Sequence, residues 1–304
     1  SYMFDSCFSI ISLNINNFDT KQVVNMSHLF HQCETLLELN INNFDTRNVE
    51  DMSFMFDNCS TLRYLDISSF VTSKVKNMEN MFRQVRLEYI DINHFDFGNV
   101  ESTAGLFDSC TKLIEVNITN LNTQNNKDMS RMFANCPVLS KINIDNIITD
   151  KVENMSSLFD ECNSLESINI TKKFITKNVL DMSNMFQDCS KLTFIELSSF
   201  ETKKVQNMSR MFEGCKALKS LDVSRFETPQ VKDMSKMFEY VSVSDLNVAN
   251  FDTSKVLYMV DMFSEMSRLT SMDVSRFNTS SVRDLSGMFY GCSILRSIDV
   301  SHFD

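Results

Sequence analysis

Apolar residues recur along the chain at the spacing of a short helix. In one unit the positions i, i+3, i+4 and i+7 hold Met52, Met55, Phe56 and Cys59. This spacing places four apolar side chains on one helix face. Asp51, immediately before them, is the expected N-cap, because its carboxylate can accept hydrogen bonds from the first free amides of a helix. The unit therefore predicts a short, half-buried helix.

A second pattern follows the predicted helix. Leu65 and Ile67 alternate with Tyr64, Asp66 and Ser68, as side chains on opposite faces of a β-strand do. Each unit thus predicts one short helix followed by one short strand, and strands from stacked units would pair in parallel.

The period of the pattern is marked by the residue that ends each predicted helix. Adjacent markers lie about 26 residues apart, which is typical of a leucine-rich-repeat-like solenoid. The sequence predicts an α/β repeat solenoid, right-handed, of about twelve turns, each with a short strand in a parallel sheet and a short helix. The markers are Cys7, Cys33, Cys59, Val85, Cys110, Cys136, Cys162, Cys189, Cys215, Val241, Met266 and Cys292.

One elongated domain is expected over residues 1–304, because no single turn can bury its apolar face alone. The sequence begins and ends within a repeat, so we expect it to be a slice of a longer protein. Two adjacent turns depart from the pattern. Residues 102–105 replace the usual Asp-Met-Ser motif and Asn126 replaces a valine, and we expect local opening to be easiest there.

Composition narrows the classes of function. The chain has 43% hydrophobic residues but only five glycines and two prolines, so its turns must rely on Asn, Asp, Ser and Thr. A net charge of -11 argues against binding to duplex nucleic acid. No stretch is apolar enough to predict a transmembrane segment.

The nine cysteines could be buried thiols, a ladder of disulfides or metal ligands. Neighbouring turns would bring them close enough for disulfides. Each cysteine shares its predicted face with methionine and phenylalanine, however, and valine or methionine replaces it in three turns. No Cys-x-x-Cys pair is present. Buried thiols and an apolar, methionine-rich core are therefore favoured.

A row of carboxylates and amides is predicted on the exposed face of the sheet. It could be a solvated surface, a binding face or a Ca²⁺ site, and exposed aromatics within it are better anchors for a partner than single charges. The predicted binding residues are Tyr64, Asp66, Tyr89, Asp91, Phe194 and Glu196. The acidic row comprises Asn14, Asn40, Asp66, Asp91, Asn117, Asn143, Asn169, Glu196, Asp222, Asn247, Asp273 and Asp299.

Two further rows have ordinary explanations. The basic row could pair neighbouring molecules, but a solvated edge that balances local acids is the favoured interpretation. A row of threonines from Thr20 to Thr279 could suggest ice binding, although threonine in a turn more often bonds to the backbone. The basic row comprises Lys21, Arg47, Lys74, Lys151, Lys177, Lys203, Lys204, Lys232 and Lys255.

Catalysis has little support in the sequence. The four histidines are scattered, and the one close pair, His28 and His31, falls on the polar side of a predicted helix. No nucleophile, base and orienting group stand out from the repeats. We therefore predict a protein that is not an enzyme, with no cofactor, no catalytic residue and no metal ligand.

The repeat unit resembles a known family. The pattern Val-x-[Asn/Asp]-Met-Ser-x-Met-Phe-x-x-Cys-x-x-Leu-x-x-Leu-Asp-[Ile/Val]-Ser-x-Phe-Asp-Thr is almost intact from Val205 to Thr228. It is similar to the repeat of BspA-like leucine-rich-repeat surface proteins, including a Mycoplasma lipoprotein repeat of unknown function. The resemblance implies a cell-surface or secreted solenoid of bacteria or parasitic protists that adheres to host proteins or other cells.

Together these observations predict a non-enzymatic cell-surface or extracellular adhesion solenoid that binds protein or glycan through its sheet face. The alternative is a cytoplasmic or cytoskeletal scaffold or filament component packed against copies of itself. Nine apparently free thiols lean towards that alternative, because disulfides are rare in reducing compartments.

Overall fold

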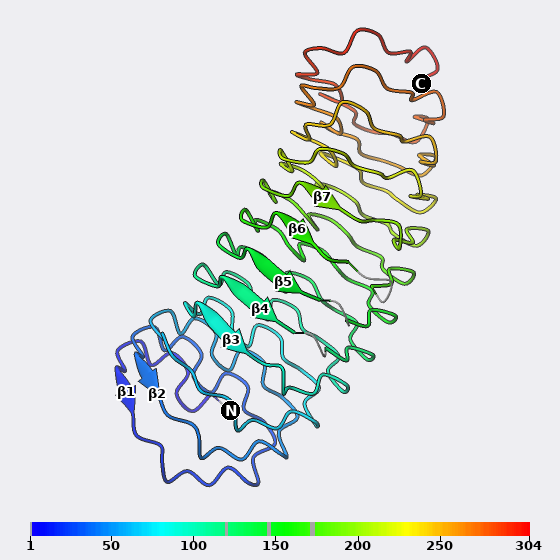
Figure 1. Cartoon of the computed structure of the whole chain (residues 1–304). Helices are drawn as coiled ribbons and strands as arrows, with labels where there is room; N and C mark the ends of the chain where they lie inside the picture. Colours follow the sequence, from blue (N-terminus) through cyan, green and yellow to red (C-terminus); the bar gives the residue numbers. More distant parts are fainter. Residues whose placement is uncertain (1, 119–120, 145–146, 171–173) are drawn as a thin grey trace.

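The chain winds into an elongated solenoid whose turns stack along one axis (Figure 1). The computed structural model describes residues 2–118, 121–144, 147–170 and 174–304. One continuous apolar core runs through the described turns. The predicted repeat solenoid is thereby confirmed, while its right-handed winding and its count of about twelve turns stay predictions.

Short parallel strands form one face of the solenoid, as the alternating pattern predicted. They pair in the order β1-β2, β3-β4-β5 and β6-β7. In the central sheet Tyr89 lies opposite Glu115, which lies opposite Lys141. The strands are β1 (Ser12–Leu13), β2 (Glu38–Leu39), β3 (Tyr89–Asp91), β4 (Glu115–Asn117), β5 (Lys141–Asn143), β6 (Ser167–Ile168) and β7 (Phe194–Ile195).

A second line of parallel bridges links the turns at the position predicted to cap the helices. It runs without a break from Asn25 to Asp284. Beside it, the Glu50 backbone amide donates to the Val24 carbonyl, and the Lys76 backbone amide donates to the Glu50 carbonyl. The donor–acceptor distance is 2.8 Å in both bonds. Backbone hydrogen bonds therefore join successive turns on this side as well as on the sheet side.

The predicted helices are wrong: no helix occurs in the described part of the chain. In the segment from Met52 to Cys59, every second amide donates to the next turn instead of along its own segment. The backbone amides of Phe54, Phe56 and Asn58 donate to the carbonyls 25 residues ahead, at distances of 2.8 to 3.0 Å. The amides between them close tight turns three residues back.

The spacing of the turns explains why helices are excluded. Phenylalanine rings equivalent to Phe56 stack along the core with centroids 5.5 to 6.0 Å apart. An α-helix with its side chains is about 10 Å wide, so helices in consecutive turns could not stack at this distance. The predicted side-chain burial is nevertheless correct, because Met52, Met55, Phe56 and Cys59 are all fully buried.

Each of these segments contains two residues in the left-handed backbone region. In the unit above they are Phe54 (φ 56°) and Asn58 (φ 55°). Among the described residues, twenty non-glycine residues adopt this conformation, and four such positions are glycine. A left-handed residue with a Cβ costs about 1 to 2 kcal/mol, so the bonds between turns must offset a repeated local cost.

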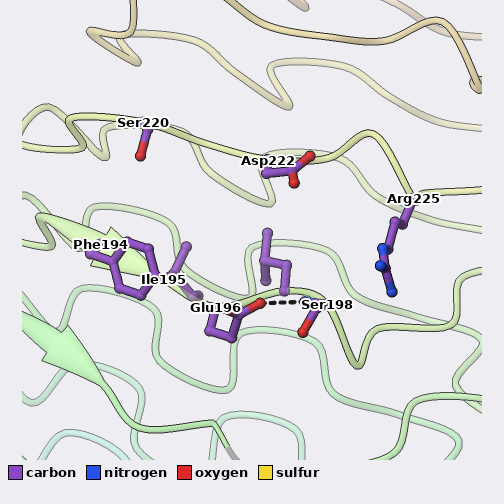
Figure 2. Close-up of a pocket in the computed structure, with 8 residues that line it drawn as sticks. Phe194, Ile195, Glu196, Ser198, Ser220, Asp222 and Arg225 are labelled. Carbon is purple, nitrogen blue, oxygen red and sulfur yellow. Dashed lines mark hydrogen bonds between the residues drawn. The ribbon is translucent and has the colours of Figure 1, made fainter.

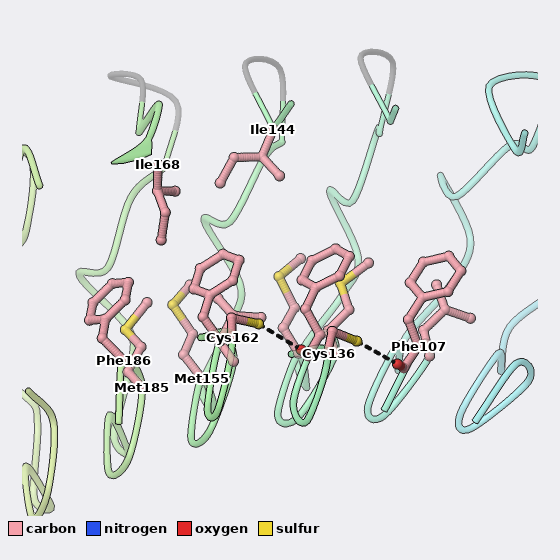
Figure 3. Close-up of a cluster of buried hydrophobic side chains, with 14 of the residues drawn as sticks. Phe107, Cys136, Ile144, Met155, Cys162, Ile168, Met185 and Phe186 are labelled. Atoms are coloured by element: carbon pink, nitrogen blue, oxygen red, sulfur yellow. Dashed lines mark hydrogen bonds between the residues drawn. The ribbon is translucent and has the colours of Figure 1, made fainter. Parts of the chain in front are cut away.

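The cysteines lie in the core as free thiols. Each thiol donates to a carbonyl of the preceding turn where a partner is seen, as Cys136 does to Phe107 (3.2 Å) and Cys162 to Phe133 (3.0 Å) (Figure 3). The favoured prediction of buried thiols is confirmed for seven of the nine, while Cys7 and Cys292 are partly exposed.

The two irregular turns contact each other in the core. Thr103 and Asn126 are both fully buried, and the side-chain Nδ2 of Asn126 donates to the Thr103 hydroxyl at a distance of 3.2 Å. The Asn126 side-chain oxygen is buried without a partner among the described residues. The two departures from the repeat therefore form one buried polar contact, and easier opening at these turns stays a prediction.

Thiol reactivity tests this core. Burial raises the pKa of Cys33 to about 11 and that of Cys136 to about 12, so the reactive thiolates are suppressed. We expect a thiol reagent at pH 8 to modify at most Cys7 and Cys292 in the native protein and all nine cysteines in denaturant. Fewer than nine reactive thiols in denaturant without reductant would contradict free cysteines.

The left-handed positions give a second test. Gln84 (φ 58°) is left-handed, whereas Gln206 is not. Gln84→Gly removes the Cβ clash, but glycine also raises the conformational entropy of the unfolded chain. The net effect should be a stabilisation of about 0.5 kcal/mol. Gln206→Gly gains no such relief and should destabilise it by about 0.5 to 1 kcal/mol. Urea unfolding of both variants measures the effects, and shifts of the same sign would contradict the argument.

Candidate functional site

Two exposed tyrosines stand side by side on the sheet face. Tyr89 begins β3 and Tyr64 lies in the preceding turn, outside any strand; their side chains are 63% and 71% exposed. They line a depression of about 620 Å³ together with exposed Leu37. The rim also carries Arg63, Arg86, Lys112 and one acid, Glu88. We call these residues the tyrosine patch.

Phe194 and Glu196 belong to a separate part of the same face. Phe194 is 53% exposed on β7 and borders a smaller depression, of about 160 Å³, with Asp222 and Arg225 (Figure 2). Strands β4 to β6 separate it from Tyr89, a distance of roughly 20 Å at the usual strand spacing. The structure therefore brings Tyr64 and Tyr89 together but not Phe194.

The predicted acids fold back on their own turns. Asp66 accepts hydrogen bonds from the Ser68 amide (3.0 Å) and hydroxyl (2.7 Å), and these bonds lower its pKa. Asp91 accepts from the Asn93 amide over 3.0 Å. The same bond recurs at Asn14, Asn40, Glu196, Asp222, Asn247, Asp273 and Asp299. The acidic row closes turns, which leaves the aromatic and basic groups as the main candidates for recognition.

The basic row also bonds within the chain. Lys74 donates to Asn48 (2.7 Å) and Lys177 to Asp150 (2.8 Å), each in the preceding turn. Equivalent bonds are made by Lys151, Lys204 and Lys255. These contacts agree with the favoured interpretation, a solvated edge that balances local acceptors, and exposed pairs of this kind contribute little stability.

The threonine row is buried and serves the backbone, as favoured from the sequence. Thr46 donates to the Val71 carbonyl (2.9 Å) and accepts from the Val71 amide (2.7 Å). Its hydroxyl therefore extends the hydrogen bonding between two turns. All ten threonines of the row are at most 6% exposed, so they do not form a surface for ice.

A row of alternating acidic and basic side chains was missed by the sequence analysis. It places Asp5, His31, Asp57, Arg83 and Asp108 at equivalent positions of consecutive turns. His31 lies 2.8 Å from Asp5 and 3.3 Å from Asp57, and Arg83 donates two bonds of 2.9 and 3.0 Å to Asp57. The Asp57 side chain is fully buried. These residues lie about 26 apart, so no local motif joins them, and the sequence analysis placed His31 on the polar side of a predicted helix.

Asp160 continues this row without an aligned cation. The equivalent positions on either side hold Ala134 and Gln187. One oxygen of the Asp160 carboxylate is buried without a partner among the described residues. Burial raises the pKa of Asp160 to about 6, although a hydrogen bond from Ser157 opposes the shift.

Among the residues that the structure describes, no helix is long and apolar enough to cross a membrane.

A family model described as "Mycoplasma protein of unknown function, DUF285" matches residues 1–113, 83–171, 128–243 and 216–304. These overlapping matches cover the chain from end to end. The resemblance drawn from the repeat between Val205 and Thr228 is thereby confirmed. No curated protein matches the chain.

Several solved structures are similar to the chain. A leucine-rich cell surface protein from Faecalibacterium prausnitzii is 17% identical, with a TM-score of 0.47, 99% of this chain covered and 76% of that one. A leucine-rich repeat protein from Bacteroides ovatus is 16% identical, with a TM-score of 0.30 and coverage of 91% and 86%. The functional domain of InlJ from Listeria monocytogenes, described as including a cysteine ladder, is 15% identical, with a TM-score of 0.30 and coverage of 86% and 60%.

The pH dependence of stability tests the environment of Asp160. Because its folded pKa lies above its ordinary value, the ionised carboxylate destabilises the fold above pH 6, and this penalty disappears as the pH falls towards 4. Asp160→Asn should therefore be more stable than the wild type at pH 7, by about 1 kcal/mol, and the difference should vanish near pH 4. Urea unfolding across this range measures it.

Asp66→Asn is the matched control. Hydrogen bonds lower the pKa of Asp66, so any stability from its charge is lost only at pH values below the ordinary aspartate pKa. Its profile should run parallel to that of the wild type between pH 7 and 5. An Asp160→Asn profile that also stays parallel would contradict a strained carboxylate.

Proposed function

Because the chain belongs to the family described as "Mycoplasma protein of unknown function, DUF285", whose description assigns no activity, we propose a function from its exposed residues. The protein is a non-enzymatic interaction module of the cell surface or the extracellular space. It binds a protein or glycan partner through its sheet face, with the tyrosine patch as the main contact.

The exposure of Tyr64 and Tyr89 is the observation that carries this proposal. Tyrosine and arginine are enriched among residues that contribute most to binding energy. Here the two tyrosines, 71% and 63% exposed, lie beside exposed Leu37 and between basic groups. A hydrophobic centre with a charged rim is the usual anatomy of a protein interface.

The charge of the patch indicates the chemistry of the partner. Arg63, Arg86 and Lys112 outnumber the single acid, Glu88, although the whole chain carries a net charge of -11. The neighbouring carboxylate of Asp66 is engaged by Ser68. The local excess of cations favours a partner with acidic groups, either an acidic protein segment or an acidic glycan.

Phe194 offers a second, separate contact on the same face. At roughly 20 Å from Tyr89, it can touch the same partner only if that partner extends along the solenoid. A long peptide or an oligosaccharide could reach both depressions, whereas a small ligand could not. The two depressions can therefore be tested independently.

The cell-surface location rests on what the BspA-like resemblance implies. The alternative, a scaffold or filament component, requires contacts between copies of the chain. Light scattering of the purified protein distinguishes the two: a monomer across a wide concentration range supports the interaction module, and open-ended assembly supports the scaffold.

Substitution of the patch tests the proposal directly. Wild-type protein is first screened against an array of acidic and neutral glycans and a panel of extracellular-matrix proteins. For each partner that binds, Tyr64→Ser with Tyr89→Ser should weaken binding about 30-fold, corresponding to about 2 kcal/mol for a central aromatic contact. Arg63→Ala should weaken binding to acidic partners more than to neutral ones.

Tyr290→Ser is the matched control, because Tyr290 is equally exposed (69%) but lies outside the sheet face. It should bind like the wild type. Phe194→Ser reports whether the partner also reaches the second depression. Unchanged binding in the double tyrosine variant, with its fold intact by circular dichroism, would rule out the tyrosine patch as the contact.

A further inference from the structure

Three metal-ligating side chains from two neighbouring turns meet near the start of the solenoid. One ligand atom from each of Asp5, His28 and His31 lies within 4.8 Å of the others. The two imidazole rings stand edge to face, with centroids 4.9 Å apart. Asp5 and His31 lie in neighbouring turns, about 26 residues apart in the sequence. The cluster therefore has no short sequence motif.

His31 has a carboxylate at each ring nitrogen. Its Nδ1 lies 2.8 Å from Asp5 and its Nε2 lies 3.3 Å from Asp57. A neutral imidazole carries one N–H and one lone pair, so it can donate to only one of them. The other contact sets a lone pair against a carboxylate oxygen, unless a second proton or a metal ion lies between them.

The contact between His31 Nδ1 and Asp5 has hydrogen-bond geometry, and a metal ion bound at Nδ1 would replace that proton and leave the single N–H on Nε2, which faces Asp57. The Asp57 side chain is fully buried and is fixed by the two hydrogen bonds from Arg83. With the proton on Nε2, the Nδ1 lone pair of His31 faces the Asp5 carboxylate. This is the position where a cation would satisfy both groups.

His28 supplies a third ligand. Its ring stacks between Tyr2 and Phe54, at 4.6 Å from each, which fixes its plane. Its Nδ1 is buried without a hydrogen-bond partner among the described residues. A neutral imidazole can coordinate a metal ion through such a nitrogen.

We propose that Asp5, His28 and His31 bind a divalent transition-metal ion, with Zn²⁺ as the best match. Two imidazoles and one carboxylate form a donor set that suits zinc, whereas Ca²⁺ and Mg²⁺ prefer oxygen ligands alone. Tetrahedral bonds of about 2.0 Å separate ligand atoms by roughly 3.3 Å. His31 Nδ1 and the Asp5 oxygen, 2.8 Å apart, would have to separate by roughly 0.5 Å to admit the ion.

The surrounding residues complete the arrangement. Asp57 lies 3.3 Å from His31 Nε2, where it would accept the outer N–H of a metal-bound His31, as carboxylates commonly do behind zinc-bound histidines. Arg83 holds Asp57 in place. The ion would fasten Asp5 of one turn to two histidines of the next, with a fourth position open to water. This site is separate from the tyrosine patch, and we propose no catalytic role for it.

Metal titration of the chain of residues 1–304, stripped of metal and without a polyhistidine tag, tests the proposal. One equivalent of Co²⁺ should bind and produce visible d–d absorption without thiolate-to-cobalt charge transfer, because the buried cysteines do not take part. Zn²⁺ should displace the Co²⁺ and raise the melting temperature. Affinity should rise from pH 5 to 7, because protons compete with the metal ion for the ligand atoms.

Histidine variants identify the ligands. His28→Ala and His31→Ala should each weaken binding at least 100-fold. His94→Ala should leave binding unchanged, since His94 bonds to the Ile67 carbonyl (3.0 Å), outside the cluster. His28→Gln serves as a milder variant if His28→Ala unfolds the first turns by circular dichroism.

Three results would overturn the site. These are unchanged binding in both cluster variants, charge-transfer bands that reveal cysteine ligands, and absence of Co²⁺ and Zn²⁺ binding by the wild type. In the last case His31 would serve only to link Asp5 and Asp57.

Discussion

Backbone hydrogen bonding between successive turns is the constraint on which the structure depends. The short strands pair on one side, and an unbroken line of bridges from Asn25 to Asp284 joins the turns on another. Between these two lines, the alternate amides of segments such as Met52 to Cys59 also donate to the next turn. Every part of a turn is therefore held close to one strand spacing from its neighbour, and this distance decides which local structures are possible.

Several unusual features follow from that spacing. A helix is too wide to stack at about 5 Å, so the chain replaces it with consecutive tight turns. These turns require two left-handed residues each, most of which are not glycine. Identical side chains then stack in rows: phenylalanine rings 5.5 to 6.0 Å apart, thiols bonded to carbonyls, and threonines bonded to the next backbone.

Stacking also determines which polar residues are engaged in bonds within the solenoid and which remain available to bind a partner. Asp66 and its equivalents close turns, Lys74 and its equivalents bond to the preceding turn, and the threonines are buried. Positions that break the repeat are different. Tyr64 and Tyr89 interrupt a row of smaller or charged residues, and His28 and His31 occur in a single turn. In a repeat protein, the residues that differ between turns are the ones free to carry specificity.

The sequence by itself determined the repeat, the parallel sheet, the buried Met, Phe and Cys positions and the exposure of Tyr64, Tyr89 and Phe194. The spacing of apolar residues along the sequence indicates which positions are buried. Met52, Met55, Phe56 and Cys59 are buried as predicted. Only the tertiary structure decided the backbone of that segment, because spacing i, i+3, i+4, i+7 fits both a helix and a series of tight turns. It also decided which distant residues meet, since stacking brings Asp5 to His31 and His31 to Asp57, pairs that a period of about 26 residues hides from any local motif.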